Sequence, residues 1–191
     1  RVLAFAVPAA VAAYFATSAV DAAHDVGAVR GLALGSAGAF RALDGVLSQA
    51  SLLVPIGTRA LRGAIVGAVF VGFFGLLAFR LAAELLRRAD GQGRLVPFVA
   101  FVASTCAAGS AATLRESTSV APSIVGAFLA ILPLALSASD SSEERERSVP
   151  FSISIAFASA LALSYEPVLG VAAIASVATL RLIERFGVRS S

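Results

Sequence analysis

The residues best suited to chemistry follow directly after the first apolar stretch, residues 2–20. Asp21, His24 and Asp25 lie together in the string VDAAHDVGAVRG, and ionisable groups beside hydrocarbon are costly and usually serve a function. A carboxylate here could act as a general base on an acceptor hydroxyl. The group could also bind a divalent metal, but no further ligand set is evident and no metal is predicted. Alternatively, Asp25 caps a helix that begins near Gly27, and the residues alone favour this cap.

If the first helix continues past the apolar stretch, Asp21 and Asp25 stand four positions apart and face the same side, with His24 adjacent. The three side chains would then converge on one site. The elements that position this site therefore decide what it can do.

The composition predicts that these elements are membrane helices. The chain is 58% hydrophobic and 14% charged, whereas soluble domains average roughly 45–50% and about 25%. Apolar stretches recur along the whole chain, so a cleaved signal peptide does not explain the composition. The net charge of +3 comes from scattered arginines, so nucleic acid is not an expected partner. We predict an all-α, polytopic membrane protein with one transmembrane domain, residues 1–191, and expect a piece of a longer protein.

Six stretches approach the length of about 20 apolar residues that a spanning helix needs. They cover residues 2–20, 60–79, 95–114, 120–137, 149–165 and 168–183. A polar tip, residues 115–118, separates the third and fourth stretches and predicts a helical hairpin. Glu166 and Pro167 separate the last two, one of which we expect to be tilted, re-entrant or broken.

The arginines predict the orientation, because positive residues are retained on the cytoplasmic side. With the N-terminus in the cytoplasm, ten of the 15 arginines fall on the cytoplasmic side and five on the outer side. The predicted location is a plasma or inner membrane. Asp21, His24 and Asp25 are then extracytoplasmic, and the charged segment 138–148 is a cytoplasmic loop.

The first outer loop, residues 21–59, is much longer than the other connections, and long ordered loops tend to be functional. Arg41, Asp44, Ser48 and Ser51 recur at helical spacing opposite an apolar side, which predicts an amphipathic helix in the membrane interface. This helix either frames a cavity at the mouth of the first span or is an inert linker; the pattern does not distinguish the two.

The second span carries small residues at intervals of four. Gly63 and Gly67 form a GxxxG pattern. Ala64, Ala68 and Gly72 lie beside it at the same spacing of four. Small residues at this spacing allow helix backbones to approach closely in a membrane. We predict mainly a packing face within the chain, with contacts between chains as the alternative.

The order of motifs around this loop resembles the transmembrane protein O-mannosyltransferase-like family, polytopic glycosyltransferases of GT-C architecture. The first span leads to an Asp-x-Gly element, Asp25-Val26-Gly27. A Leu-Pro-x-Gly-like turn follows at Leu53-Val54-Pro55-Ile56-Gly57, and then Ala60-Leu61-Arg62 opens the second span. The resemblance covers residues 2–86, and later spans match only in hydropathy and spacing. The chain would be a divergent member or an N-terminal half.

The resemblance implies transfer of a sugar such as mannose from a polyprenyl-phosphate donor to an extracytoplasmic acceptor. The acceptor could be a protein. The donor is a substrate, and no separate cofactor is expected. Asp25 occupies the place of the family's catalytic acidic residue, and Asp21 and His24 would support it. The residues expected to hold the lipid phosphate by charge-assisted hydrogen bonds are Arg30, Arg41 and Arg115.

Two other functions stay open. Family members commonly have Glu after the Asp-x-Gly, where this chain has Ala28, and the stretch GSAGAFRALDG lacks the usual His-Pro-Pro-Gly-Tyr-Pro-like motif. These departures favour a noncatalytic scaffold or a subunit of a membrane complex. A transporter ranks third, because it would need intramembrane charges and spans broken at the midplane.

Overall fold

A computed structural model describes residues 1–19, 53, 55, 59–90, 93–111, 113–114, 124–138, 149–165 and 167–186. Within these ranges the regular structure is helical, and no strand is present. The predicted all-α class is therefore confirmed for the described part of the chain.

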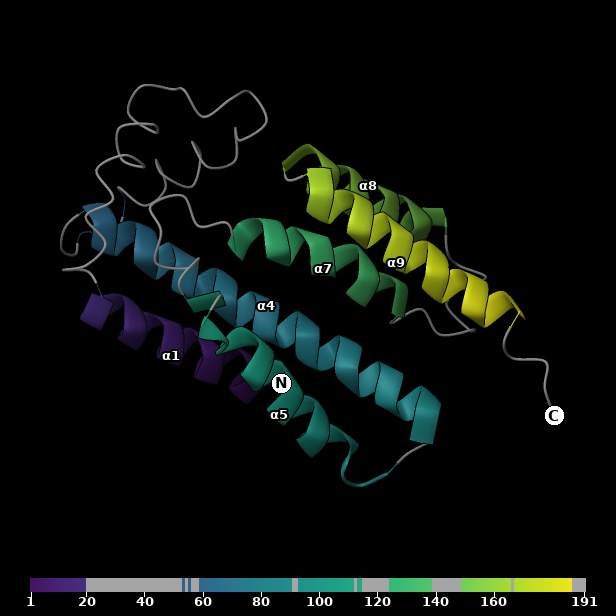
Figure 1. The fold of residues 1–191 in the computed structure, drawn as a ribbon, viewed down its shortest axis with the longest axis horizontal. Coiled ribbons are helices and arrows are strands. Elements are labelled where there is room, and N and C mark those ends of the chain that lie inside the picture. The colour runs from purple at the N-terminus through teal and green to yellow at the C-terminus, as the bar shows by residue number, and fades with distance from the viewer. Residues whose placement is uncertain are drawn as a thin grey trace.

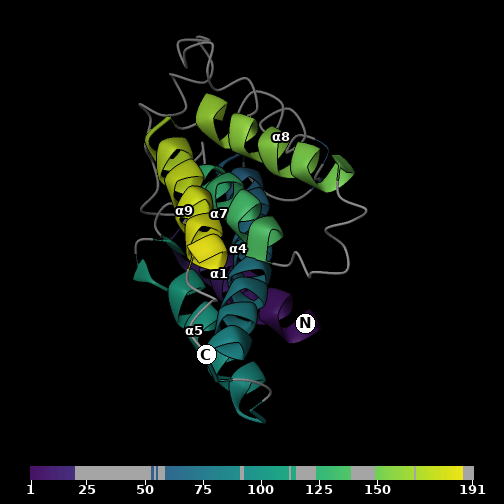
Figure 2. The same ribbon diagram turned by 90° about the vertical axis from the view of Figure 1, so that its right-hand side faces the viewer.

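Six helices make up this part, and each runs roughly opposite to the helix before it (Figure 1). Seen from the side, α8 is inclined to its neighbours (Figure 2). Their bounds are α1 Val2–Ala19, α4 Arg59–Asp90, α5 Val96–Ala108, α7 Ile124–Ala138, α8 Val149–Tyr165 and α9 Pro167–Phe186.

Helix α4 is the centre of the arrangement. It packs against α1, α5 and α7, while α7 packs in turn against α8 and α9. The described helices therefore form two groups, one around α4 and the other around α7, joined where α4 and α7 meet.

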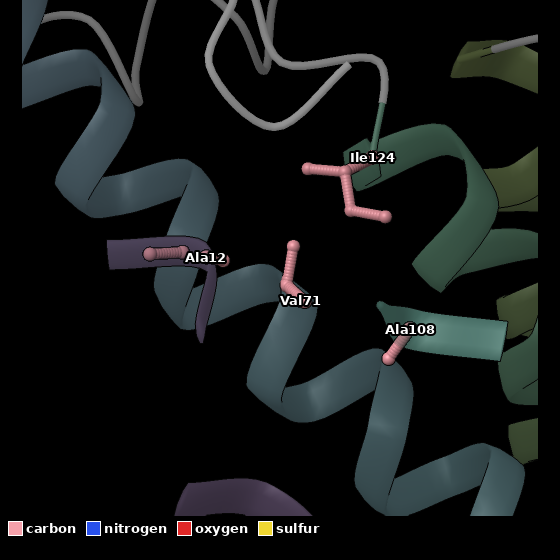
Figure 3. Close-up of a cluster of buried hydrophobic side chains, with 5 residues drawn as sticks. Ala12, Val71, Ala108 and Ile124 are labelled. Atoms are coloured by element: carbon pink, nitrogen blue, oxygen red, sulfur yellow. The ribbon is translucent and has the colours of Figure 1, made fainter. Parts of the chain in front are cut away.

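Small side chains form the contact between the helices of the first group. Ala12, Ala68, Val71, Ala108 and Ile124 come from α1, α4, α5 and α7 and meet in one buried cluster (Figure 3). Alanine predominates among the buried hydrophobic residues of the described ranges as a whole. Helices with such short side chains at their contacts can approach closely, as is typical of helices packed in lipid.

Phenylalanine rings connect the two groups of helices. Phe70 of α4 lies with its ring centroid 5.5 Å from that of Phe128 of α7, and Phe73 lies 6.1 Å from the same ring. The Phe70 and Phe128 pair is edge-to-face, a favourable geometry for aromatic rings. Phe70 and Phe128 also pack against a second buried cluster, formed by Val125, Leu129, Ala162 and Tyr165.

The predicted second span, residues 60–79, lies within α4, and this helix continues to Asp90. The predicted span stopped before Arg80, but a charge does not end a helix. Residues 81–86 are good helix formers. Glu84 pairs with Arg87 at 3.8 Å and Arg88 at 3.4 Å, which supports the last turns.

The predicted third span, residues 95 to about 114, is not one continuous helix, because α5 ends at Ala108. At Gly109 the backbone turns out of the helix with φ −86° and ψ 4°. The side chain of Thr113 then donates a hydrogen bond to the carbonyl of Ala107 at 3.1 Å, which satisfies an acceptor at the helix end. Helix α8 occupies the predicted residues 149–165, and α9 differs from the predicted 168–183 by one residue at its start and three at its end. The predicted start of the fourth stretch, residues 120–123, lies outside the described residues.

Candidate functional site

The sequence-predicted site lies outside the described residues. This holds for Asp21, His24 and Asp25, and equally for the arginines predicted to hold phosphate, Arg30, Arg41 and Arg115. The expected interfacial helix and most of the charged segment 138–148 lie outside them as well. What the structure describes is the set of helices on either side of these segments.

The helices that flank the predicted site end on one side of the molecule. Figure 1 shows the C-terminal ends of α1, α5 and α8 together with the N-terminal ends of α4, α7 and α9. The chain therefore leaves α1 and enters α4 at the same end. The acids predicted after α1 and the arginine predicted after α5 both follow helix ends on this side.

The contact between α1 and α4 depends on Gly72. A Cβ atom at this position would lie 2.9 Å from the Cβ of Ala9 and 2.8 Å from a ring carbon of Phe5. Only a residue without a side chain fits at this distance. The prediction that small residues of the second span form a packing face within the chain is confirmed at Gly72.

One helical turn further along α4, Gly75 packs against Pro8. Proline has no N–H, so the carbonyl of Ala4 loses its partner within α1. A Cβ at Gly75 would lie 3.0 Å from this carbonyl oxygen and 2.8 Å from Cγ of Pro8. The absence of a side chain at Gly75 therefore makes room for both the proline ring and the freed carbonyl. Pro8 is fully buried in this contact.

The α8–α9 pair forms an equally close contact. A Cβ at Gly170 would lie 2.3 Å from Cα of Leu163, on the last turn of α8. Tyr165, at the end of α8, is 5% exposed and joins the cluster around Leu129 of α7. The C-terminal end of α8 is thereby held against α7.

At the opposite end, charged side chains connect α4 to α7. Arg88 donates a hydrogen bond to the carbonyl oxygen of Ala138, the last residue of α7, and also to Glu84 at 3.4 Å. An arginine at the C-terminal end of a helix satisfies a free carbonyl and complements the helix dipole. This interaction sets the position of α7 along α4.

A cavity lies at the same contact as Gly72 and Gly75, toward the N-terminal end of α1. It has a volume of about 420 Å³, and its lining residues are Arg1, Val2, Phe5, Phe73, Leu76 and Arg80. Sequence reasoning missed this site. The available signal was the spacing: Arg1 and Phe5 are four apart, while Phe73, Leu76 and Arg80 follow at helical intervals.

The described ranges contain no group of three or more His, Cys, Asp or Glu side chains that could hold a metal ion. The lone cysteine, Cys106, is exposed on α5.

One described helix is long and apolar enough to cross a membrane by itself. This is the Leu61–Arg88 part of α4, in which an 18-residue window has a mean hydropathy of 2.2. The other described helices are apolar but shorter in the same comparison. Comparisons with models of protein families, with curated proteins and with solved structures found no match. The family resemblance therefore depends on the order of motifs in the sequence.

Proposed function

We propose that the chain is a polytopic membrane protein whose six helices lie across the bilayer in alternating directions. The observation that supports this is the distribution of side-chain size. Buried positions are held mostly by alanine and glycine, whereas large apolar side chains point outward, among them Phe98 at 65% exposed and Phe157 at 65% exposed. Water would penalise such exposure, but lipid does not.

Three helices strengthen this reading because they are apolar on every side. Helices α1, α5 and α8 have no charged residue in their described bounds and no polar face. A helix that is apolar all round belongs either in the interior of a large protein or in a membrane. Since these helices lie on the outside of the described arrangement, lipid is the environment that covers them.

The orientation follows from the arginines. Arg87 and Arg88 end α4, and Arg94 precedes α5. By the retention of positive charge on the cytoplasmic side, this end of the helices faces the cytoplasm. The opposite end, where α1 ends and α4 begins, is then extracytoplasmic. The proposed location is a plasma or inner membrane with the N-terminus inside.

Within this membrane protein we propose a GT-C-like glycosyltransferase activity, with a polyprenyl-phosphate sugar as donor and an extracytoplasmic acceptor. Asp25 is the proposed base, removing the proton of the acceptor hydroxyl as the new glycosidic bond forms and the lipid phosphate leaves. Support comes from the Asp25-Val26-Gly27 element between the first two spans, and from the antiparallel packing of α1 on α4. Because of this packing, α1 ends and α4 begins at the same end of the helices, the one that we propose to be the outer end.

The second candidate is a noncatalytic scaffold or complex subunit with the same membrane arrangement. Ala28 in place of the family's glutamate favours it, as does the stretch GSAGAFRALDG without histidine or proline. A scaffold needs the packing of α1 on α4 but not the carboxylate of Asp25. The two candidates therefore differ in a single measurable property.

Sugar transfer decides between these candidates. The full-length protein is purified and given polyprenyl-phosphate mannose and a hydroxyl-bearing peptide, and the transfer rates of D25N and D44N are compared with that of the parent. Because a general base contributes about 10²–10⁴-fold, D25N should lose at least about 100-fold. D44N removes a carboxylate from the same segment and should retain the parent rate.

Equal rates for D25N and the parent would remove Asp25 as the base. No transfer by the parent, with its fold verified by a cooperative unfolding transition, would favour the scaffold. The orientation is tested separately with S117C and S142C in a C106S background, which contains no other cysteine. A membrane-impermeant maleimide added to intact cells should label S117C and leave S142C unlabelled.

A further inference from the structure

The cavity between α1 and α4 combines a cationic rim with an apolar floor. Phe5 and Phe73 meet across the contact with ring centroids 5.0 Å apart, edge-to-face. Arg1 precedes Phe5 by one helical turn, and Arg80 follows Phe73 by about 10 Å along α4 at 1.5 Å per residue. Because α1 and α4 are antiparallel, both arginines lie toward the same end of the contact, beyond the rings.

The charge on this rim is not neutralised from within the described ranges. Neither Arg1 nor Arg80 forms an ion pair there, whereas Arg87 and Arg88 are both paired with Glu84. Arg1 and Arg80 are also exposed. Guanidinium groups bind the oxygens of phosphate and carboxylate groups through two parallel hydrogen bonds, so this rim suits an anion of either kind.

The apolar floor identifies which phosphate compound fits. Val2 is 80% exposed and Phe73 is 42% exposed, so the cavity opens onto the apolar surface that we assign to lipid. A free phosphate or a nucleotide would leave this floor without a partner. A phospholipid places an acyl chain on it. Basic pockets between helices on the cytoplasmic side are known binding sites for anionic lipid head groups.

We propose that this cavity binds an anionic phospholipid of the cytoplasmic leaflet. Its phosphate lies between the guanidinium groups of Arg1 and Arg80, and one acyl chain lies along Phe5, Phe73 and Leu76. The proposal rests on the membrane orientation proposed above and is independent of sugar transfer.

The test measures lipid binding to the full-length protein in detergent by native mass spectrometry. Phosphatidylglycerol is compared with phosphatidylcholine of the same chain length and with inorganic phosphate. Each arginine near a membrane surface contributes about 1 kcal/mol toward an anionic lipid, which corresponds to about fivefold in affinity. R80Q and R1Q should each weaken phosphatidylglycerol binding about fivefold, and the double variant about 25-fold.

R94Q is the matched control, because Arg94 is exposed near the same end of α4 but does not line the cavity. It should bind phosphatidylglycerol as the parent does. An equal loss in R94Q and R80Q would show general surface attraction and overturn the proposal, as would equal binding of phosphatidylcholine or full displacement by inorganic phosphate. Unchanged binding in the double variant would overturn it as well.

The outcomes separate this proposal from the proposed function. Loss of sugar transfer in D25N, with phosphatidylglycerol binding unchanged, bears only on the proposed glycosyltransferase activity. Labelling of S142C from outside would instead reverse the orientation and overturn the assignment of the lipid to the cytoplasmic leaflet. R80K keeps the charge but loses the paired hydrogen bonds, so its affinity for phosphatidylglycerol should lie between those of the parent and R80Q. An affinity as low as that of R80Q would contradict a role for charge.

Discussion

Adding one methyl group at Gly72 should weaken the contact that joins α1 to α4. The new Cβ in G72A would lie 2.9 Å from the Cβ of Ala9, whereas ordinary contacts begin at 3.4 Å, so α1 must move by about 0.5 Å. The Cβ of Ala9 is attached directly to the helix backbone and cannot rotate away. Overpacking of this kind costs about 1–3 kcal/mol.

Helix propensity opposes part of this cost, because alanine is about 1 kcal/mol more favourable than glycine inside a helix. The expected net effect of G72A is a loss of about 1 kcal/mol in the free energy of unfolding. G72V adds further atoms to the same contact and regains less propensity, so its loss should reach about 2–3 kcal/mol. Unfolding of the purified protein by SDS in mixed micelles measures both.

V69I is the matched control, because it adds one carbon to α4 on an exposed side chain. It should change the free energy of unfolding by less than about 0.5 kcal/mol. A double-mutant cycle with F5A isolates the contact further, since the Phe5 ring lies 2.8 Å from the new Cβ. Residues in contact couple by about 0.5–3 kcal/mol. If G72A is more stable than the parent and shows no coupling to F5A, α1 does not pack on this face of α4.

Two further changes test the other helix contacts by the same SDS titration. G170A should lose more stability than G72A, at least about 2 kcal/mol, because its Cβ would lie 2.3 Å from the backbone of Leu163 and no side-chain rotation relieves this contact. The control is G109A, whose Cβ would meet only a carbonyl oxygen at 3.0 Å. Equal losses in the two variants would contradict the α8–α9 contact. R88Q should lose about 1–2 kcal/mol, because the charged hydrogen bond to the Ala138 carbonyl disappears. E84Q removes only the helix-surface pairs and should lose a few tenths; if its loss equals that of R88Q, Arg88 does not hold α7.

The agreement between predicted and observed helices depends on what ends each helix. Residues 149–165 were predicted correctly because polar segments border an unbroken apolar stretch on both sides. The second stretch was predicted shorter than the helix that contains it, because the prediction stopped before Arg80, whereas both the apolar segment and the helix continue past this residue. The third was predicted too long, because the apolar character continues past the backbone turn at Gly109.

For the candidate site, the sequence supplied the residue types and their order along the chain. Asp25 and its accompanying arginines remain a prediction, because they lie outside the described residues. The cavity with Arg1 and Arg80 was missed for a physical reason. Its two halves are far apart in sequence, and only the antiparallel packing of α1 on α4 brings them together.

The amino-acid sequence by itself determined the helical class, the apolar character and the presence of small residues for close packing. These properties depend on local composition and periodicity. Only the tertiary structure decided which small residues meet which helix: Gly72 and Gly75 receive α1, and Gly170 receives α8. Alanine and glycine are so frequent in this chain that many pairings satisfy the same pattern. The choice among them follows from shape and from single interactions between distant residues, such as Arg88 with Ala138.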